Sequence, residues 1–193
     1  MLRLAVIGHA EHITIGRVAA IPRAGDITHV RDPRVIVGGG GGIAFFQLVR
    51  SDAALHLFTA LGNDEAARFV EQQLAATRAT IHAVRRSEPH TRDVVMIGPD
   101  GERTIVVVGE PLHPRADDPL PWDLLDDVDA VYFTAQDPAL LVRARRARVW
   151  WSRRAGASAS RPPAWRWMRS SAAGSIRARR AREATTRSRR WRW

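Results

Sequence analysis

Polar side chains suited to ligand binding follow two apolar runs of the sequence. His9 and Glu11 come at the end of the run Leu2–Gly8, and Gln136 follows the run Asp129–Thr134. The carboxyl ends of parallel strands share one edge of a sheet, and open α/β sheets bind ligands at that edge. We therefore expect these imidazole, carboxyl and carboxamide groups to meet at a ligand site. The alternatives are a solvated loop for His9 and Glu11 and a helix cap for Gln136.

A run of five glycines, Gly38–Gly42, is the second feature that indicates binding. Each glycine costs up to about 1 kcal/mol relative to alanine, so we do not expect the run inside a helix or a strand. The β-rich segment Arg34–Val37 precedes it, and an apolar helical segment, Ile43–Arg50, follows it. A strand, a glycine turn and a helix N-terminus would present bare N–H groups to a polar or anionic ligand. A flexible surface loop is the alternative.

The elements that must position these groups are strands alternating with helices. Strands are expected at 2–8, 55–60, 81–84 and 129–134, with another beginning at Val149, and helices at 43–50, 65–77, 122–125 and 138–147. Asn63 or Asp64 is expected to cap the helix at 65–77, because short polar side chains satisfy the free N–H groups of a first turn. This alternation predicts an α/β domain with a mostly parallel sheet.

Two pairs of β-rich segments interrupt this alternation and predict a small β flap. Residues 13–19 and 27–37 contain β-branched stretches broken by turns, and residues 91–97 and 103–108 flank the turn Gly98–Glu102. We expect these segments to form a flap, or lid, at about 12–37 and 91–109 over the carboxyl edge of the main sheet.

Four motifs occur in a characteristic order along residues 2–148. They are Gly8-His9-Ala10-Glu11 at a strand end, the glycine run before a helix, Thr59–Glu65 before the next helix, and Thr91 followed by Asp100-Gly101-Glu102-Arg103-Thr104. Together they resemble the N-terminal half of a ribokinase-like sugar kinase of the PfkB carbohydrate kinase family. The resemblance implies a ribokinase-like three-layer α/β fold, here truncated, with a mostly parallel sheet, helices on both faces and a β lid.

The resemblance also implies an activity, the ATP-dependent phosphorylation of a sugar or nucleoside hydroxyl with Mg²⁺ neutralising phosphate charge. The substrate-binding residues that it implies are His9, Glu11, Gly39, Gly40, Gly41 and Gln136. Ile43 stands where the family usually has Asn, and Glu11 stands where Asp is commoner, which leaves the identity of the sugar open. Lids of this kind pair between subunits in some members, so the resemblance implies a homodimer.

The catalytic motif of that family does not occur after residue 149. In the family, a Gly-Ala-Gly-Asp sequence at a helix start supplies an anion hole and a general base. Arg23-Ala24-Gly25-Asp26 is superficially similar, but the strand-like residues 27–30 follow it, and we expect it to be a turn in the lid. We therefore expect no catalytic residue here, no productive ATP binding, and an inactive fragment that carries the sugar-side pocket.

The sequence changes character near residue 150. The net charge is +10, but residues 1–149 carry −2 and residues 150–193 carry +12, together with six of the seven Trp. One interpretation is a nucleic-acid-binding arm, in which Arg neutralises phosphates and Trp stacks on bases. The other, which we favour, is a frameshifted reading frame, because all 30 basic residues are Arg and a GC-rich gene yields such a composition. We thus divide the chain into 1–149 and a non-globular tail, 150–193.

Composition excludes several other classes of protein. The absence of cysteine excludes disulfides and thiolate metal sites. No run of about 18 apolar residues is present to span a membrane, and the segment 1–8 resembles a buried strand more than a signal peptide. The histidines lack ligand spacing and the acidic residues near 123–129 have no partner ligands, so we expect no metal site. A cytoplasmic protein is the default expectation.

Overall fold

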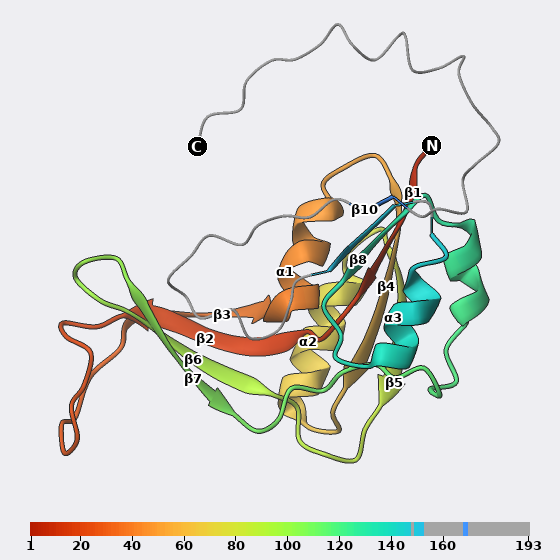
Figure 1. Cartoon of the computed structure of the whole chain (residues 1–193). Coiled ribbons are helices and arrows are strands. Elements are labelled where there is room, and N and C mark those ends of the chain that lie inside the picture. Colours follow the sequence, from red (N-terminus) through yellow and green to blue (C-terminus); the bar gives the residue numbers. More distant parts are fainter. Residues whose placement is uncertain (148, 153–167, 170–193) are drawn as a thin grey trace, which may run out of the picture.

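The computed structural model describes residues 1–147, 149–152 and 168–169, which form two β-sheets (Figure 1). Within these residues the main sheet has the order β10-β9-β8-β1-β4-β5. Its strands are β1 (Arg3–Ile7), β4 (Ala54–Leu61), β5 (Thr80–Arg85), β8 (Ala130–Phe133), β9 (Val149–Ser152) and β10 (Met168–Arg169). β10 pairs antiparallel with β9, and the other neighbours are parallel. The predicted mostly parallel sheet is confirmed.

Strand β1 lies at the centre of the main sheet because both of its faces are apolar. It pairs with β4 on one side and with β8 on the other. Ala5 and Ile7 pack into one core, whereas Val6 packs into a second core on the opposite face. A strand that is buried on both faces needs a continuous apolar run, and this is what the sequence shows at residues 4–7.

Helices cover both faces of the main sheet, as predicted (Figure 1). They are α1 (Gly39–Leu48) and α2 (Glu65–Ala75) on one face, and the 3₁₀ helix η1 (Trp122–Asp127) and α3 (Pro138–Ala144) on the other. Phe45 and Leu74 bring α1 and α2 into the second core, the one that contains Val6. Trp122 of η1 stacks on Phe58 of β4 with ring centroids 5.0 Å apart, which fixes η1 against the sheet.

Three helices end earlier than their sequence patterns predict, and the first of them is α1, which ends at Leu48 instead of Arg50. The Asp64 side chain caps α2 by accepting a hydrogen bond from the Ala67 N–H at 3.0 Å, as expected. The helix ends at Ala75 because the N–H and the hydroxyl of Thr77 both donate to the Leu74 carbonyl and turn the chain. Helix α3 ends at Ala144 instead of 147.

The second sheet, which we call the lid, extends away from the main sheet (Figure 1). Its order is β3-β2-β6-β7, with β2 (Glu11–Arg17), β3 (Arg31–Gly38), β6 (Arg92–Ile97) and β7 (Arg103–Val108). The Gly98–Glu102 turn joins β6 and β7, and Gly101 has the positive φ of 83° that such a turn requires. The expected strand at 27–37 begins only at Arg31. The residues before it include the turn at Arg23–Asp26.

The expectation that the glycine run lies outside regular structure is wrong. Gly38 ends β3, and Gly39–Gly42 form the first turn of α1, which therefore begins four residues before the predicted Ile43. The intrinsic cost of these glycines is offset by packing, since Gly39, Gly41 and Gly42 are buried against the end of β1. Tertiary contacts thus override helix propensity here.

The sheet continues past the predicted boundary at residue 149. β9 begins at Val149, where the next strand is expected, and pairs in parallel with β8 through Ser152. Met168 and Arg169 add β10. The remainder of the predicted tail, 153–167 and 170–193, lies outside the described residues, as do the two interpretations of it. In the described part of the chain, no helix is long and apolar enough to cross a membrane.

Candidate functional site

His9 caps the N-terminus of helix α1. The Gly40 N–H donates to His9 Nε2 at 3.1 Å. The N–H groups of Gly41 and Gly42 donate to the His9 carbonyl at 2.9 and 3.1 Å. The expectation that the glycine run offers bare N–H groups to an anion is therefore wrong for these three, because the residue after β1 already satisfies them.

The glycines are required by the close approach of the chain to itself. A Cβ on Gly41 would lie 2.7 Å from the Gly8 carbonyl carbon and 2.8 Å from the His9 oxygen. A Cβ on Gly39 would lie 2.8 Å from the His9 ring, and Gly39 also has a positive φ of 77°. This geometry explains Gly39–Gly41 without a ligand. Their predicted approach to sugar hydroxyls remains a prediction.

His9 is a neutral hydrogen-bond donor in this site. Because Nε2 accepts from Gly40, the proton lies on Nδ1, which is buried and has no partner among the described residues. Burial, together with the neighbouring His113, lowers the pKa of His9 to about 4. The nearby positive end of the α1 dipole acts in the same direction. The Nδ1–H group therefore remains available to an oxygen acceptor at neutral pH.

Glu11 is a buried carboxyl group beside His9. It is 7% exposed, and its Oε1 lies 3.4 Å from His9 Nε2. Burial and the hydrogen bond and charge of Asp93 raise the pKa of Glu11 to about 8. At neutral pH this contact thus joins a neutral imidazole to a protonated carboxyl and is not an ion pair. The predicted pair His9 and Glu11 does come together at the carboxyl end of β1.

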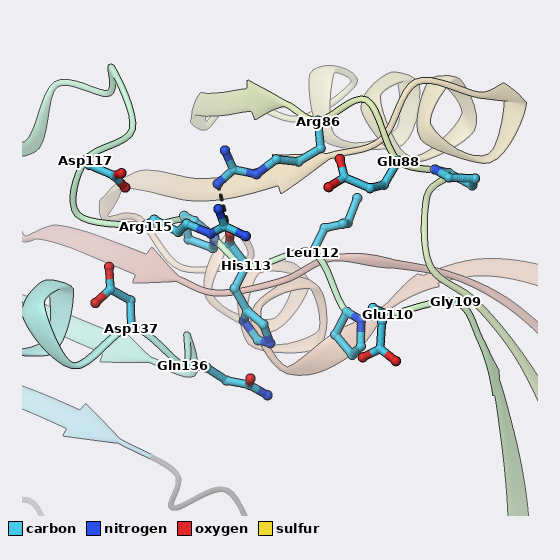
Figure 2. A pocket seen from close by; sticks show the side chains of 13 residues that line it. Arg86, Glu88, Gly109, Glu110, Leu112, His113, Arg115, Asp117, Gln136 and Asp137 are labelled. Carbon is cyan, nitrogen blue, oxygen red and sulfur yellow. Dashed lines mark hydrogen bonds between the residues drawn. The ribbon is translucent and has the colours of Figure 1, made fainter.

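A cavity of about 670 Å³ reaches this region at His113, one of the residues that line it (Figure 2). The rest of its lining comes from Arg86, Glu88 and Pro89, from most of the segment 109–117 that follows the lid, and from Gln136 and Asp137. Gln136 is the one predicted substrate-binding residue that lines the cavity. His113 connects the cavity to His9, because it lines the cavity and its ring meets the His9 ring edge-on at 4.6 Å.

The wall of the cavity is held by a buried ion pair. Arg86, just after β5, donates two hydrogen bonds to Asp118 at 2.7 and 2.8 Å and one to the His113 carbonyl at 3.2 Å. The Trp122 Nε1–H donates to the Asp118 carbonyl at 3.0 Å. This network fixes the 109–121 segment, which has no regular structure of its own before η1.

Three residues of the site were not predicted from the sequence. His113 has both ring nitrogens buried without a partner in the described part of the chain, and the same holds for Thr134 Oγ1, which follows β8. Asp93 faces Glu11 from β6. Asp93 had a signal in the sequence, since an acidic residue directly precedes the apolar run Val94–Ile97 of β6. His113 had none, because it lies in a segment without a motif.

The polar groups of this site suit a hydroxyl-bearing ligand. His9 and Glu11 are both uncharged at neutral pH, Thr134 and Gln136 are neutral at every pH, and Asp93 adds one carboxyl group beside Glu11. The described residues contain no group of three or more His, Cys, Asp or Glu side chains able to hold a metal ion. In the first turn of α1, the N–H groups of Gly40, Gly41 and Gly42 are already satisfied and are not available to a phosphate.

Comparison with known proteins identifies the relatives of this chain. The family model described as pfkB family carbohydrate kinase matches residues 1–169. No curated protein sequence gives a significant match. The match ends 20 residues beyond the predicted boundary at 149, within β10.

Solved structures of ribokinases share the fold. Ribokinase from Giardia lamblia has a TM-score of 0.67 and 16% identity, over 82% of this chain and 56% of its own. A putative ribokinase from Agrobacterium tumefaciens has a TM-score of 0.64 and 20% identity, over 75% of this chain and 48% of its own. Arabidopsis thaliana ribokinase, complexed with ribose and ATP, has a TM-score of 0.57 and 17% identity, over 76% of this chain and 50% of its own. The chain thus spans about half the length of these structures. With this fold, and with the family model matched over most of its length, the chain belongs to the PfkB family of carbohydrate kinases.

Proposed function

We propose that this chain binds a sugar or nucleoside at the carboxyl ends of β1 and β8, as the sugar side of an ATP-dependent kinase site. One observation carries the proposal. Buried polar atoms converge at this edge without partners among the described residues: His9 Nδ1, Thr134 Oγ1 and both ring nitrogens of His113. Buried polar atoms normally have hydrogen-bond partners, and hydroxyl groups of a ligand would supply them.

The roles of the proposed substrate-binding residues follow from their protonation states. His9 donates through Nδ1–H, and protonated Glu11 donates through its carboxyl proton. Gln136 offers both an amide donor and an amide acceptor from the cavity wall. A polyhydroxy compound both donates and accepts at each hydroxyl, so it matches this mixed set.

We propose that phosphoryl transfer needs catalytic groups that this chain does not provide. The family reaction moves the γ-phosphoryl of ATP to a substrate hydroxyl, with Mg²⁺ and a general base. The sequence has no Gly-Ala-Gly-Asp motif after residue 149. We propose that the purified chain binds substrate without turning it over.

Calorimetric titration with a panel of pentoses, hexoses and ribonucleosides tests the binding. At least one compound should bind, and Gln136→Ala should weaken its binding about tenfold, the effect of losing one hydrogen bond. Gln73→Ala is the matched control, because Gln73 is exposed on α2. Binding by no compound, or equal effects of the two substitutions, would contradict the proposal.

A coupled assay for ADP formation tests the proposed lack of turnover. We expect no sugar-dependent ADP above the background of ATP hydrolysis, with an intact PfkB-family kinase as the positive control. Sugar-dependent turnover of ATP by the chain would overturn this part of the proposal and leave the binding site standing.

We further propose that the lid pairs with a second copy of the chain. Both lid faces expose aliphatic side chains about 40–50% accessible to solvent: Ile36, Ile105 and Val107 on one face, and Val35, Val106 and Val108 on the other. Exposed apolar surface of this kind often marks an interface. β3 and β7 also present free edges in the described sheet.

A further inference from the structure

We propose that Asp93 is a positioning residue of the substrate site: it shares one proton with Glu11, so that the two buried carboxyls together present one donor and one acceptor to adjacent hydroxyls. This inference rests on the proposed sugar-binding function. Asp93 lies on the lid, remote in sequence from Glu11, and acts on the substrate through Glu11.

The register of the lid places the two carboxyls on one face. Asp93 of β6 is the Cα partner of Ile13 on β2, two residues from Glu11. Side chains two residues apart on a strand point to the same side. His12 points the other way, toward α2, where its ring meets Phe69 at 5.2 Å. Glu11 and Asp93 therefore share the face that meets His9.

Both carboxyls are taken out of water without a neutralising cation. Glu11 is 7% exposed and Asp93 is 5% exposed. The titratable groups on their side are His9 and, beyond it, His113, and burial lowers the pKa of each histidine. Two like charges in such a site are mutually unfavourable, so the pair keeps one proton between them.

The charged groups on the opposite face do not compensate the pair. Arg92 follows the alternation of β6 to the other side, where it donates to Asp64 at 2.7 Å. His12 lies on that side as well. On the carboxyl face itself, the register of the lid places Arg34 and Arg103, which are exposed and lie farther out along β3 and β7. The pKa of Glu11 is raised by burial and by Asp93, so the proton of the pair is the means by which its charge is reduced.

The unpartnered oxygen of Asp93 allows the pair to accept a hydrogen bond as well as to donate one. Asp93 Oδ1 is buried and has no hydrogen-bond partner in the described part of the chain. With one proton for the two carboxyls, carried by Glu11, the pair offers Asp93 Oδ1 as an acceptor and the Glu11 carboxyl proton as a donor. If Asp93 were neutral and could not share the proton, Glu11 would ionise and the site would lose this donor.

Carbon-13 NMR of the full-length chain labelled at Glu carboxyls tests the shared proton without any ligand. The Glu11 signal, assigned with Glu11→Gln, should titrate near pH 8 in the wild type. In Asp93→Asn it should titrate about two units lower, because the neighbouring charge is gone. Asp52→Asn, at an exposed aspartate, should leave it unchanged. An ordinary Glu11 titration in the wild type, or no shift in Asp93→Asn, would overturn the proposal.

A second labelling keeps the test decisive if Asp93→Asn does not fold. Asp carboxyls are then labelled in Glu11→Gln, and the Asp93 signal, assigned in the wild type, is followed. Loss of Glu11 should change the chemical shift of the Asp93 carboxyl carbon at neutral pH, whereas a chemical shift identical to that in the wild type would show that the two carboxyls do not interact.

Binding across pH then separates the positioning role from the proposed function. D-ribose, D-fructose and adenosine serve as probes from about pH 6 to about pH 9. A bound probe should lose about tenfold in affinity in the wild type as the shared proton leaves near pH 8, and in Asp93→Asn the midpoint of this loss should move about two units lower. A loss of the same size and midpoint in both proteins would overturn the role of Asp93. Binding of no probe at any pH would overturn the proposed function and the positioning role with it, even where NMR shows the shared proton.

Discussion

The main sheet and the lid are built from similar apolar runs but bury them to very different extents. β1 reads Arg-Leu-Ala-Val-Ile and β7 reads Arg-Thr-Ile-Val-Val-Val. In β1, Val6 and Ile7 are fully buried between two layers of helices, whereas in β7 the residues Val106 and Val107 are about half exposed. Composition therefore marks both as strands, but only the presence of covering layers makes one of them core.

This difference assigns separate tasks to the two sheets. The helices on both faces of the main sheet hold His9 and Thr134 at fixed strand ends. The lid contributes Glu11 and Asp93 from its base, where β2 and β6 leave the body of the protein. The candidate site thus lies where a well-packed sheet meets a poorly covered one.

Truncation of a core side chain should produce the largest effect. Leu57→Ala in β4 removes a side chain with no exposed surface and should lower the free energy of unfolding by about 3 kcal/mol. Val107→Ala in β7, where 49% of the residue is exposed, should cost about 0.5 kcal/mol or less. Urea denaturation of both variants measures the contrast. Equal losses would show that the lid is as tightly packed as the main sheet.

Alanine within the glycine run should have the next largest effect, at the junction of the two sheets. Gly41→Ala forces a Cβ against backbone atoms of Gly8 and His9 and should cost about 2 kcal/mol. Gly42→Ala is the matched control, because its Cβ meets a movable Val37 methyl at 3.2 Å. There the gain in helix propensity, about 1 kcal/mol, should offset the contact. Thermal unfolding of both variants measures this, and a Gly41→Ala variant as stable as the control would contradict the close approach.

Glu11 should contribute to the pH dependence of stability between about pH 6.5 and about pH 8. Folded Glu11 keeps its proton to about pH 8, whereas the unfolded chain loses it near 4.5. At Glu11 the folded state therefore binds more protons in this window, and this contribution falls as pH rises. Histidines act in the opposite direction at the lower end of the window, because folding lowers their pKa values from 6.5 and the unfolded chain still binds part of their protons there: His9, His56, His82, His90 and His113. The contribution of Glu11 is therefore measured as the difference between the wild type and Glu11→Gln.

Glu11→Gln should remove this contribution. Relative to the variant, we expect the wild type to lose about 1–2 kcal/mol across the window, within the limit of 1.36 kcal/mol per pH unit for one proton. Urea denaturation of both proteins at a series of pH values measures this difference, to which the histidines contribute equally in the two. Glu102→Gln, in the exposed lid turn, should behave as the wild type. Parallel profiles of the wild type and Glu11→Gln would refute the raised pKa.

Much of the fold follows from local patterns in the sequence. The continuous apolar run at residues 4–7 predicts a strand that is buried on both faces. Asp64 before an amphipathic stretch predicts its own role as a helix cap, and the Gly98–Glu102 turn predicts its hairpin. His9 and Glu11 could be placed together because they lie two residues apart at a strand end.

The remaining features depend on partners that are distant in sequence. Gly39–Gly42 become helical because Gly8 and His9 lie against them, which no local propensity encodes. The carboxyl pair requires the parallel pairing of β2 with β6, and the sequence does not specify that register. His113 belongs to the site because Arg86 and Asp118 hold its segment, an ion pair that is visible only in three dimensions.

Single charges on the lid should have the smallest effect on stability, yet they test what covers its exposed faces. Val107→Lys and Val106→Lys place a charge on opposite faces of β7, and each should change the free energy of unfolding by about 0.5 kcal/mol or less because these sites are half exposed. If a second copy covers one face, the lysine on that face should shift the chain from dimer to monomer, because burying an unpaired charge is costly. Light scattering coupled to size-exclusion chromatography measures this, with the other variant as the control. A wild-type chain that stays monomeric at every concentration would refute the pairing, and equal dimerisation of all three proteins would place the interface away from the lid.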